Sequence, residues 1–325
     1  MRYRKMGRTG LLVSEICLGT MTFGQQTDET EATRIINHAL SAGVNFIDTA
    51  DGYVDGKSEE IIGRTLKENR HSVVLATKMG AWKSGPAVTD IGASRKHIMK
   101  EIENSLRRLG TDYIDLYYIH TPDYNTPIEE TLRAFDDLVR QGKVRYIACS
   151  NFRAFQLARA LCVSALKNLT RFDCIQSPYN LITRDIEYEL LPLCAEDGVG
   201  VCVYNPLAGG LLTGKHDPTK PPPPGRFTVA RLGPMYSGRY WTTHNFEAVT
   251  RLKQVAEEHG RSLTHFSLAW ILNNQTITSV ISGVSSLKQL EDNLGATEIT
   301  LSAEELTACD EVWQQLAPRQ FLYGR

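Results

Sequence analysis

The chain has 325 residues, of which 42% are apolar and 22% are charged, so a largely disordered chain is excluded. Its 36 basic and 37 acidic residues give a formal net charge of −1. This balance excludes strong general attraction to nucleic acid or to an anionic membrane, and neither is expected as a partner. No run approaches the roughly 20 apolar residues of a membrane span, and no signal peptide is expected.

Seven cysteines and eight histidines show neither a disulfide pattern nor a metal-binding pattern. The number of cysteines is odd, and no pair has the CxxC spacing. Five cysteines lie in apolar segments and are interpreted as reduced packing residues: Cys17, Cys149, Cys174, Cys194 and Cys202. The histidines form no HxxxH or HExxH motif, so no metal site is expected. Reduced cysteines favour a cytoplasmic protein.

Near the start of the chain, a Gly-Arg-Thr-Gly turn at residues 7–10 separates two short segments of mixed polar and apolar residues. Residues 2–14 are therefore predicted to form a β-hairpin. Eight apolar runs predict strands at residues 15–18, 45–48, 73–78, 113–120, 144–150, 174–176, 199–204 and 280–282. Helical periodicity occurs between them, for example at residues 29–42, 58–67, 94–109, 129–140 and 152–166. Glycines typical of helix ends follow helical patterns at Gly43, Gly110, Gly142, Gly198 and Gly260. Eight alternating elements predict a (β/α)8 barrel, in one domain over residues 1–325.

Residues 208–244, a long insertion after the seventh predicted strand, break the alternation. The segment is rich in Gly and Pro, and its aromatic residues Tyr236, Tyr240 and Trp241 show no periodic pattern. A long irregular insertion in a compact domain is usually a lid or a binding loop. A poorly ordered surface loop is the alternative.

Three predicted strands end on side chains suited to proton transfer. Asp48, Lys78 and His120 each close an apolar run, and Tyr53 follows Asp48 by five residues. In a parallel α/β barrel the carboxyl ends of all strands open on the same face, so these four side chains are expected to converge. Taken one at a time, Asp48 could cap a loop, Lys78 could be exposed to solvent, and His120 could be a core residue whose hydrogen bonds are satisfied.

Together, the four side chains predict a tuned proton donor for the reduction of a carbonyl group. The reaction needs a hydride, which a nicotinamide can supply, and a proton from an acid stronger than free tyrosine. A neighbouring ammonium lowers the pKa of a phenol, so Lys78 could activate Tyr53. Asp48 could hold Lys78 charged and in place, and His120 could donate a hydrogen bond to the substrate oxygen.

Ten stretches of the chain resemble, in order and spacing, those of one enzyme family. They include Asp-Thr-Ala-Asp-Gly-Tyr at 48–53 and Ala-Gly-Gly-Leu-Leu-Thr-Gly-Lys at 208–215. The stretches are 19–24, 45–53, 58–63, 77–78, 106–109, 115–120, 142–147, 150–152, 176–180 and 204–215. Over nearly its whole length the chain is similar to the aldo-keto reductase superfamily. It looks closest to the branch of bacterial general reductases and potassium-channel β subunits.

The resemblance implies NADP(H)-dependent reduction of aldehydes to alcohols, with ketones as an open alternative. The catalytic tetrad of the family matches Asp48, Tyr53, Lys78 and His120. NADP(H) would bind without a Rossmann domain, and no GxGxxG motif follows a predicted strand. The residues implied in cofactor binding are Ser150, Asn151, Gln176, Tyr204, Leu207, Gly209, Leu212, Lys215, Gly283, Ser285, Gln289, Asp292 and Asn293.

Several of these positions have a second interpretation. Ser150 and Asn151 could cap the helix that begins near residue 152, and Gln176 could be a buried structural amide. The last helix in this set, 286–295, could bind phosphate at its N-terminus or only pack on the barrel. Its loop carries Lys288 as the only charged residue among 283–289, so the preference for NADPH over NADH stays open.

Substrate specificity is expected to come from loops, namely Met21, Phe23, Trp82, Tyr124 and the insertion 208–244. The substrate itself and the oligomeric state are not predicted. Two other functions stay open at this point. The chain could be a cofactor-binding regulatory or partner-binding module with slow turnover, or a barrel enzyme of another class, such as a phosphosugar isomerase.

Overall fold

The computed structural model describes residues 1–81, 84–229 and 232–317. They form two compact units, each with its own internal packing. The first unit contains residues 1–177, 186–204 and 276–291, and the second contains residues 178–185, 205–275 and the chain from residue 292. The expectation of one domain over the whole chain stays a prediction.

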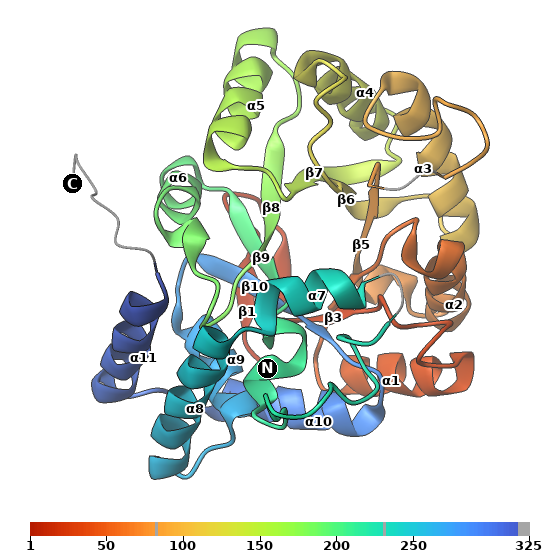
Figure 1. The fold of residues 1–325 in the computed structure, drawn as a ribbon. Coiled ribbons are helices and arrows are strands. Elements are labelled where there is room, and N and C mark those ends of the chain that lie inside the picture. Colours follow the sequence, from red (N-terminus) through yellow and green to blue (C-terminus); the bar gives the residue numbers. More distant parts are fainter. Residues whose placement is uncertain (82–83, 230–231, 318–325) are drawn as a thin grey trace. The chain divides into compact units, whose positions relative to one another are not determined.

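The first unit is built on eight parallel strands that close into a barrel (Figure 1). Around the ring the order is β10, β3, β4, β5, β6, β7, β8 and β9. Their bounds are β3 (Ile16–Gly19), β4 (Phe46–Asp48), β5 (Val74–Met79), β6 (Ile114–Ile119), β7 (Val144–Ser150), β8 (Phe172–Pro178), β9 (Gly200–Tyr204) and β10 (Ile277–Gly283). Every strand overlaps a predicted apolar run, although β8 and β10 extend beyond their predicted bounds, and the predicted (β/α)8 barrel is confirmed.

Helices follow the strands and lie outside the ring of the first unit (Figure 1). They are α1 (Glu29–Ser41), α2 (Lys57–Leu66), α3 (Arg95–Leu109), α4 (Ile128–Arg140), α5 (Ala154–Lys167), α6 (Leu190–Asp197) and α10 (Leu287–Gly295), which begins in this unit. Ser94 is the N-cap of helix α3, and its hydroxyl accepts the N–H of His97. Helices α3 and α6 end at Gly110 and Gly198, with φ of 61° and 63°. Glycine adopts this left-handed conformation easily, as the sequence indicated.

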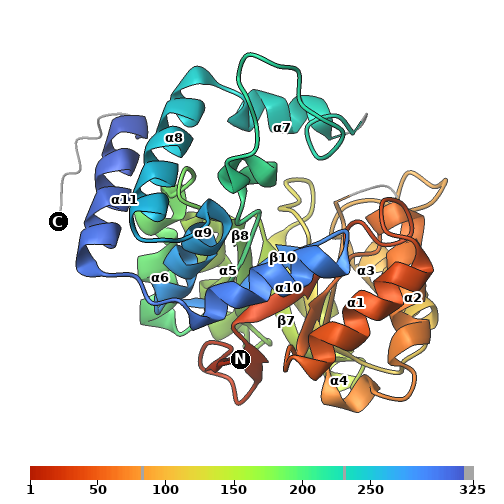
Figure 2. The ribbon, with the colours of Figure 1, turned by 90° about the horizontal axis from the view of Figure 1, so that it is seen from below.

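The N-terminal hairpin consists of β1 (Tyr3–Lys5) and β2 (Leu12–Ser14), which pair antiparallel. It lies beyond one end of the barrel strands (Figure 2). Met6 and Val13 are fully buried and pack against side chains from inside the barrel. The predicted hairpin is confirmed, and its apolar residues close that end of the barrel.

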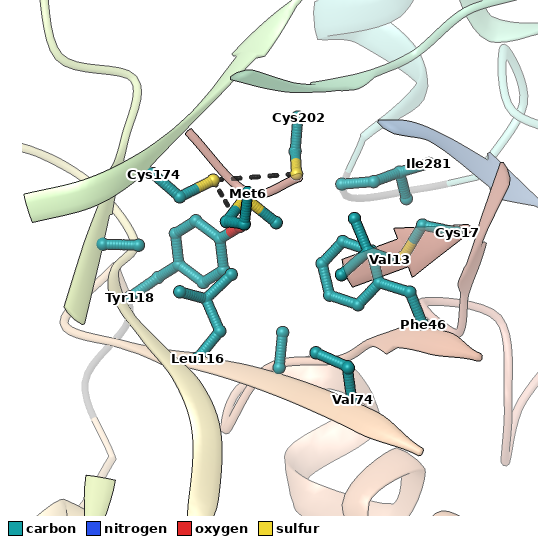
Figure 3. Packing of buried hydrophobic residues seen from close by; sticks show 12 residues of the cluster. Met6, Val13, Cys17, Phe46, Val74, Leu116, Tyr118, Cys174, Cys202 and Ile281 are labelled. Carbon is teal, nitrogen blue, oxygen red and sulfur yellow. Dashed lines mark hydrogen bonds between the residues drawn. The ribbon is translucent and has the colours of Figure 1, made fainter. Parts of the chain in front are cut away.

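The interior of the barrel is filled by one apolar or weakly polar side chain from each strand (Figure 3). We call this set the core layer: Cys17, Phe46, Ala76, Tyr118, Ala148, Cys174, Cys202 and Ile281. The Sγ atoms of Cys174 and Cys202 are 3.6 Å apart, and the Tyr118 hydroxyl lies 3.3 Å from the Cys174 sulfur. All seven cysteines are free thiols, and the five assigned to apolar segments are buried, so their interpretation as packing residues is confirmed.

The second unit is largely helical within the described residues. It contains α7 (Gly233–Tyr240), α8 (Thr243–Glu258), α9 (Leu263–Asn273) and α11 (Ala303–Leu316), with 3₁₀ turns at Ala208–Thr213. The expectation of irregular structure over residues 208–244 is wrong in part, because α7 and the start of α8 fall within it. Tyr236 and Tyr240 lie four residues apart on α7, with ring centroids separated by 6.2 Å. Aromatic packing therefore stabilises a helix that has little sequence periodicity.

None of the helices among the described residues is both long and apolar enough to cross a membrane.

Candidate active site

At the carboxyl ends of the barrel strands, the inward positions just beyond the core layer carry small or polar residues. They are Gly19, Asp48, Lys78, His120, Ser150, Gln176, Tyr204 and Gly283. Side chains alternate along a strand, so a residue two positions after a core-layer residue faces the same interior. We call these eight residues the mouth layer. All except Gly19 belong to the set of site residues predicted from the sequence.

Lys78, Asp48 and Tyr53 are joined by direct contacts. The Lys78 Nζ donates to Asp48 Oδ1 at 2.5 Å, to the Thr49 carbonyl at 2.7 Å and to the Tyr53 hydroxyl oxygen at 3.3 Å. Lys78 is fully buried and Asp48 is 2% exposed. An ammonium has three donors, so these three acceptors satisfy Lys78 and fix its direction.

Burial and charge act in opposite directions on this pair. Burial lowers the pKa of Lys78, but the Asp48 carboxylate and Tyr53 outweigh it, so the pKa of Lys78 is raised. Burial raises the pKa of Asp48, while the Lys78 ammonium and then the Gln176 amide oppose that rise. Lys78 therefore keeps its charge 3.3 Å from the Tyr53 oxygen. An ammonium at this distance favours the phenolate form of a tyrosine.

His120 directly follows β6 and faces the ring of Tyr53. The two ring centroids are 6.0 Å apart, and the rings are nearly perpendicular at 77°. Burial, and then the charge of Lys78, lower the pKa of His120 well below its usual value. The imidazole is therefore neutral near neutral pH, and a neutral imidazole can both donate and accept a hydrogen bond.

The loop that carries Tyr53 is held by the strand beside it. The N–H groups of Thr49 and Asp51 donate to the carbonyls of Ala76 and Lys78 at 2.9 and 3.0 Å. Immediately after Tyr53, Val54 has a φ of 50°, which is rare for a β-branched residue. Such strain persists only where surrounding contacts impose it, so the position of Tyr53 is strongly determined.

Ser150 and Asn151 form a connected polar group at the end of β7. The Asn151 amide donates to the His120 carbonyl at 2.9 Å and to the Ser150 hydroxyl at 3.1 Å. The Tyr204 hydroxyl donates to Asn151 Oδ1 at 2.8 Å. Helix α5 is capped by Arg153, so the alternative that Ser150 and Asn151 cap it is wrong.

Gln176 contacts the Asp48 carboxylate directly. Its Nε2 donates to Asp48 Oδ2 at 2.9 Å, and the residue is 3% exposed. The sequence predicted both residues in the site but not the contact between them, because they lie 128 positions apart. No sequence signal specifies how far a side chain reaches across a barrel.

Six residues implied in cofactor binding lie in the second unit: Leu207, Gly209, Leu212, Lys215, Asp292 and Asn293. Within that unit, the Leu207 carbonyl accepts the N–H groups of Gly210 and Leu212 at 2.8 and 3.2 Å. Gly209 has a φ of 70°, and a Cβ atom there would lie 2.7 Å from the Tyr236 ring. A glycine is therefore required at this turn for its conformation and for space.

The start of α10 carries the two remaining predicted residues, Ser285 and Gln289. The backbone N–H and the hydroxyl of Ser285 donate to Gln289 Oε1 at 2.8 and 3.1 Å. Glu31, which the sequence did not indicate, accepts the N–H of Leu287 at 2.9 Å and a guanidinium N–H of Arg34 at 3.0 Å. A carboxylate from α1 thus occupies the N-terminus of α10.

The residues predicted to contact substrate have diverse environments. Phe23 is fully buried, Met21 is half-buried, and Tyr124 is 79% exposed. The Gln156 amide donates to the Tyr124 hydroxyl at 3.2 Å. Trp82 lies outside the described residues. Direct contacts thus connect Asp48, Lys78 and Tyr53 with Gln176.

Comparison with known proteins gives consistent matches along the chain. The sequence model of the Aldo/keto reductase family matches residues 15–314. A Bacillus subtilis (strain 168) protein named "Uncharacterized oxidoreductase YrpG" is 38% identical over 323 residues, which cover 96% of each chain. Two proteins, from Oryza sativa subsp. japonica and Arabidopsis thaliana, are each named "Probable voltage-gated potassium channel subunit beta". Both are 36% identical over 304 residues, which cover 92% of each chain.

Proposed function

The chain belongs to the aldo/keto reductase family, a family of oxidoreductases, and we propose that it reduces aldehydes to alcohols with NADPH. Ketones are a secondary substrate class in this proposal. The observation that carries it is the buried contact chain from Asp48 through Lys78 to the Tyr53 hydroxyl. The free cysteines are consistent with the reducing cytoplasm as its location.

The polar residues of the mouth layer fit a nicotinamide group. A carboxamide both donates and accepts hydrogen bonds, and Ser150, Asn151 and Gln176 offer both functions at adjoining strand ends. When bound, the nicotinamide supplies the hydride. Tyr204 is placed beside Asn151 by its 2.8 Å hydrogen bond, and we assign its ring the role of a stacking surface.

Tyr53 donates the proton to the carbonyl oxygen in this mechanism. Lys78 stabilises the phenolate that remains, because its ammonium already lies 3.3 Å from the hydroxyl oxygen. Asp48 keeps Lys78 charged and directed at Tyr53. The neutral His120, whose ring faces that of Tyr53, donates a hydrogen bond to the substrate oxygen and orients it.

The test is a panel of aldehydes and ketones with NADPH, in which the loss of NADPH absorbance is followed and the alcohol is identified. Aldehydes are expected to give the highest kcat/KM. The same panel is repeated with NADH to measure the cofactor preference. If every carbonyl leaves NADPH unconsumed while the protein binds NADPH, the reductase proposal is wrong.

The names of two relatives favour a second candidate function. Both plant proteins are named as probable β subunits of potassium channels, which suggests a cofactor-binding module that acts on a partner protein. Single-turnover kinetics separate the two functions. Rapid oxidation of bound NADPH by an aldehyde, followed by slow steady-state turnover, would favour the regulatory module over the enzyme.

A further inference from the structure

One hydrogen bond spans the interior of the barrel at the level of the mouth layer. Gln176 lies on β8, and Asp48 lies on β4. These strands are four steps apart in the order β4, β5, β6, β7, β8, which is the largest separation that a closed ring of eight strands allows. The 2.9 Å bond from Gln176 Nε2 to Asp48 Oδ2 therefore joins opposite walls of the barrel.

This bond gives each oxygen of the Asp48 carboxylate its own partner. Oδ1 accepts from Lys78 at 2.5 Å, and Oδ2 accepts from Gln176 at 2.9 Å. All three residues are at most 3% exposed, so water cannot replace either partner easily. A hydrogen bond to a buried carboxylate favours its charged form and draws negative charge toward the donor.

We propose that Gln176 is a positioning residue of the proton donor, which sets the acidity of Tyr53 through Asp48 and Lys78. The inference rests on the proposed role of Tyr53 and adds a second role to the expected contact of Gln176 with the nicotinamide. Without the amide donor, Asp48 Oδ2 has no hydrogen bond from the opposite wall. The carboxylate charge then offsets more of the Lys78 ammonium, and the phenolate of Tyr53 is less stabilised.

Three further titratable groups near Asp48 and Lys78, on Cys17, Tyr118 and His120, are neutral near neutral pH. They therefore add no charge to the electrostatic coupling from Asp48 through Lys78 to Tyr53. Burial raises the pKa of Cys17 on β3 and of Tyr118 on β6 well above their usual values. Burial lowers the pKa of His120 well below its usual value, with a further contribution from Lys78. Near neutral pH, the charge of Asp48 therefore reaches the Tyr53 hydroxyl through the Lys78 ammonium, which contacts both.

The experiment is a pH titration of Tyr53 in the full-length protein without cofactor or substrate. Tyrosine is labelled with ¹³C at the ring carbon that bears the hydroxyl, and Tyr53→Phe identifies the Tyr53 signal by its loss. Gln176→Met keeps the length of the side chain and removes the donor. We expect the midpoint of Tyr53 ionisation to rise by about half a pH unit, a change of about threefold in the ratio of phenolate to phenol.

Ser150→Ala is the matched control, because Ser150 belongs to the same expected nicotinamide site but its hydroxyl bonds to the Asn151 amide and the Gln176 carbonyl rather than to Asp48. We expect it to weaken NADPH binding and to leave the Tyr53 midpoint unchanged. Gln176→Asn, one methylene too short to reach Asp48, is expected to behave like Gln176→Met and serves if the latter does not fold.

An unchanged or lowered midpoint in a folded Gln176 variant overturns the inference, as does an equal shift in Ser150→Ala. The titration needs neither turnover nor bound cofactor. A failed search for carbonyl reduction would therefore reject the proposed function and leave the coupling measurement intact. In the active enzyme, the pH profile of kcat at saturating cofactor is expected to shift with the same midpoint, whereas loss of a cofactor contact alone would change KM for NADPH.

Discussion

The core layer and the mouth layer occupy the same barrel and the same strands, two residues apart, yet their chemistry differs completely. On β4, Phe46 of the core layer is followed by Asp48 of the mouth layer, and on β5 Ala76 is followed by Lys78. The core layer is apolar or weakly polar and packs against the hairpin residue Met6. The mouth layer holds charged groups in a buried site.

The two layers contribute in different ways to the stability of the fold and to the proposed chemistry. Apolar groups in the core layer contribute burial, which is the main favourable term in folding. Burying the charges of the mouth layer is unfavourable unless every group is paired, and Asp48 and Lys78 are paired with each other and with Gln176 or Thr49. Substitutions in the two layers should therefore affect different measurements.

The largest effect is expected in the core layer. Phe46 is fully buried, and Phe46→Ala leaves a cavity beside Met6 and Val13. We expect the free energy of unfolding to fall by about 3–5 kcal/mol, as measured by urea denaturation. The mouth-layer variant Ser150→Ala is the comparison and should lose about 1 kcal/mol. If both variants lost a similar free energy of unfolding, the two layers would not differ in their contribution to stability.

The next effect is catalytic. Tyr53→Phe keeps the ring and removes the proposed acid, so kcat should fall by at least about 10²-fold. NADPH affinity and the melting temperature should change little, because the role proposed for Tyr53 is to supply the reacting proton rather than to contact the cofactor. Near-normal turnover in this variant would remove Tyr53 from the mechanism and leave the proton donor to be sought among the mouth-layer residues.

The periodicity of the sequence was sufficient to predict the ring of strands, because most of the short apolar runs end at a polar residue such as Asp48 or Lys78. The step of two residues from the core layer to the mouth layer also identifies Gly19, which the site prediction omitted. The contacts of Gln176 with Asp48 and of Glu31 with Leu287 were not predictable, since they depend on barrel curvature and side-chain rotamers. Helix α7 was missed because aromatic packing stabilises it in a segment rich in Gly and Pro.

A third buried region extends the comparison: it is polar, and its charged side chains come from the loop after β4 and from helices α2 and α3. The carboxylate oxygens of Asp51 are buried, and no side chain in the described part of the protein forms a hydrogen bond to them. Burial, and then the charges of Glu59 and Glu101, raise the pKa of Asp51 well above its usual value. Arg108 contacts both glutamates at 2.5 and 3.0 Å, so it compensates them before it compensates Asp51.

Asp51→Asn should therefore stabilise the protein increasingly as the pH rises. The unfolded chain releases the Asp51 proton near pH 3.9, whereas the folded chain holds it to higher pH, so wild-type stability is lost over that interval. Asn has no proton to lose. We expect the difference in unfolding free energy between variant and wild type to grow by more than about 1 kcal/mol from about pH 5 to about pH 8. A difference that stays constant with pH would show that Asp51 is ionised throughout.

The smallest effect concerns the choice between NADPH and NADH at the start of α10. Phosphate groups commonly bind barrel enzymes at a helix N-terminus after the last strands, but here the Glu31 carboxylate accepts the Leu287 N–H at 2.9 Å. If the 2′-phosphate binds there, the Glu31 carboxylate competes with it for the Leu287 N–H and repels its negative charge. Glu31→Gln should then improve NADPH binding by about 0.3–1 kcal/mol, and NADH binding should stay the same because NADH lacks that phosphate.

Gln289→Ala is the complementary change, since Gln289 holds Ser285 through two hydrogen bonds to its Oε1. It should weaken NADPH more than NADH, whereas Lys215→Ala should weaken both, because both carry the pyrophosphate that Lys215 is proposed to contact. Fluorescence titration of each variant with each cofactor measures these dissociation constants. Equal changes for the two cofactors in Glu31→Gln and in Gln289→Ala would place the 2′-phosphate away from this helix start, and Lys288 would then be the next residue to substitute.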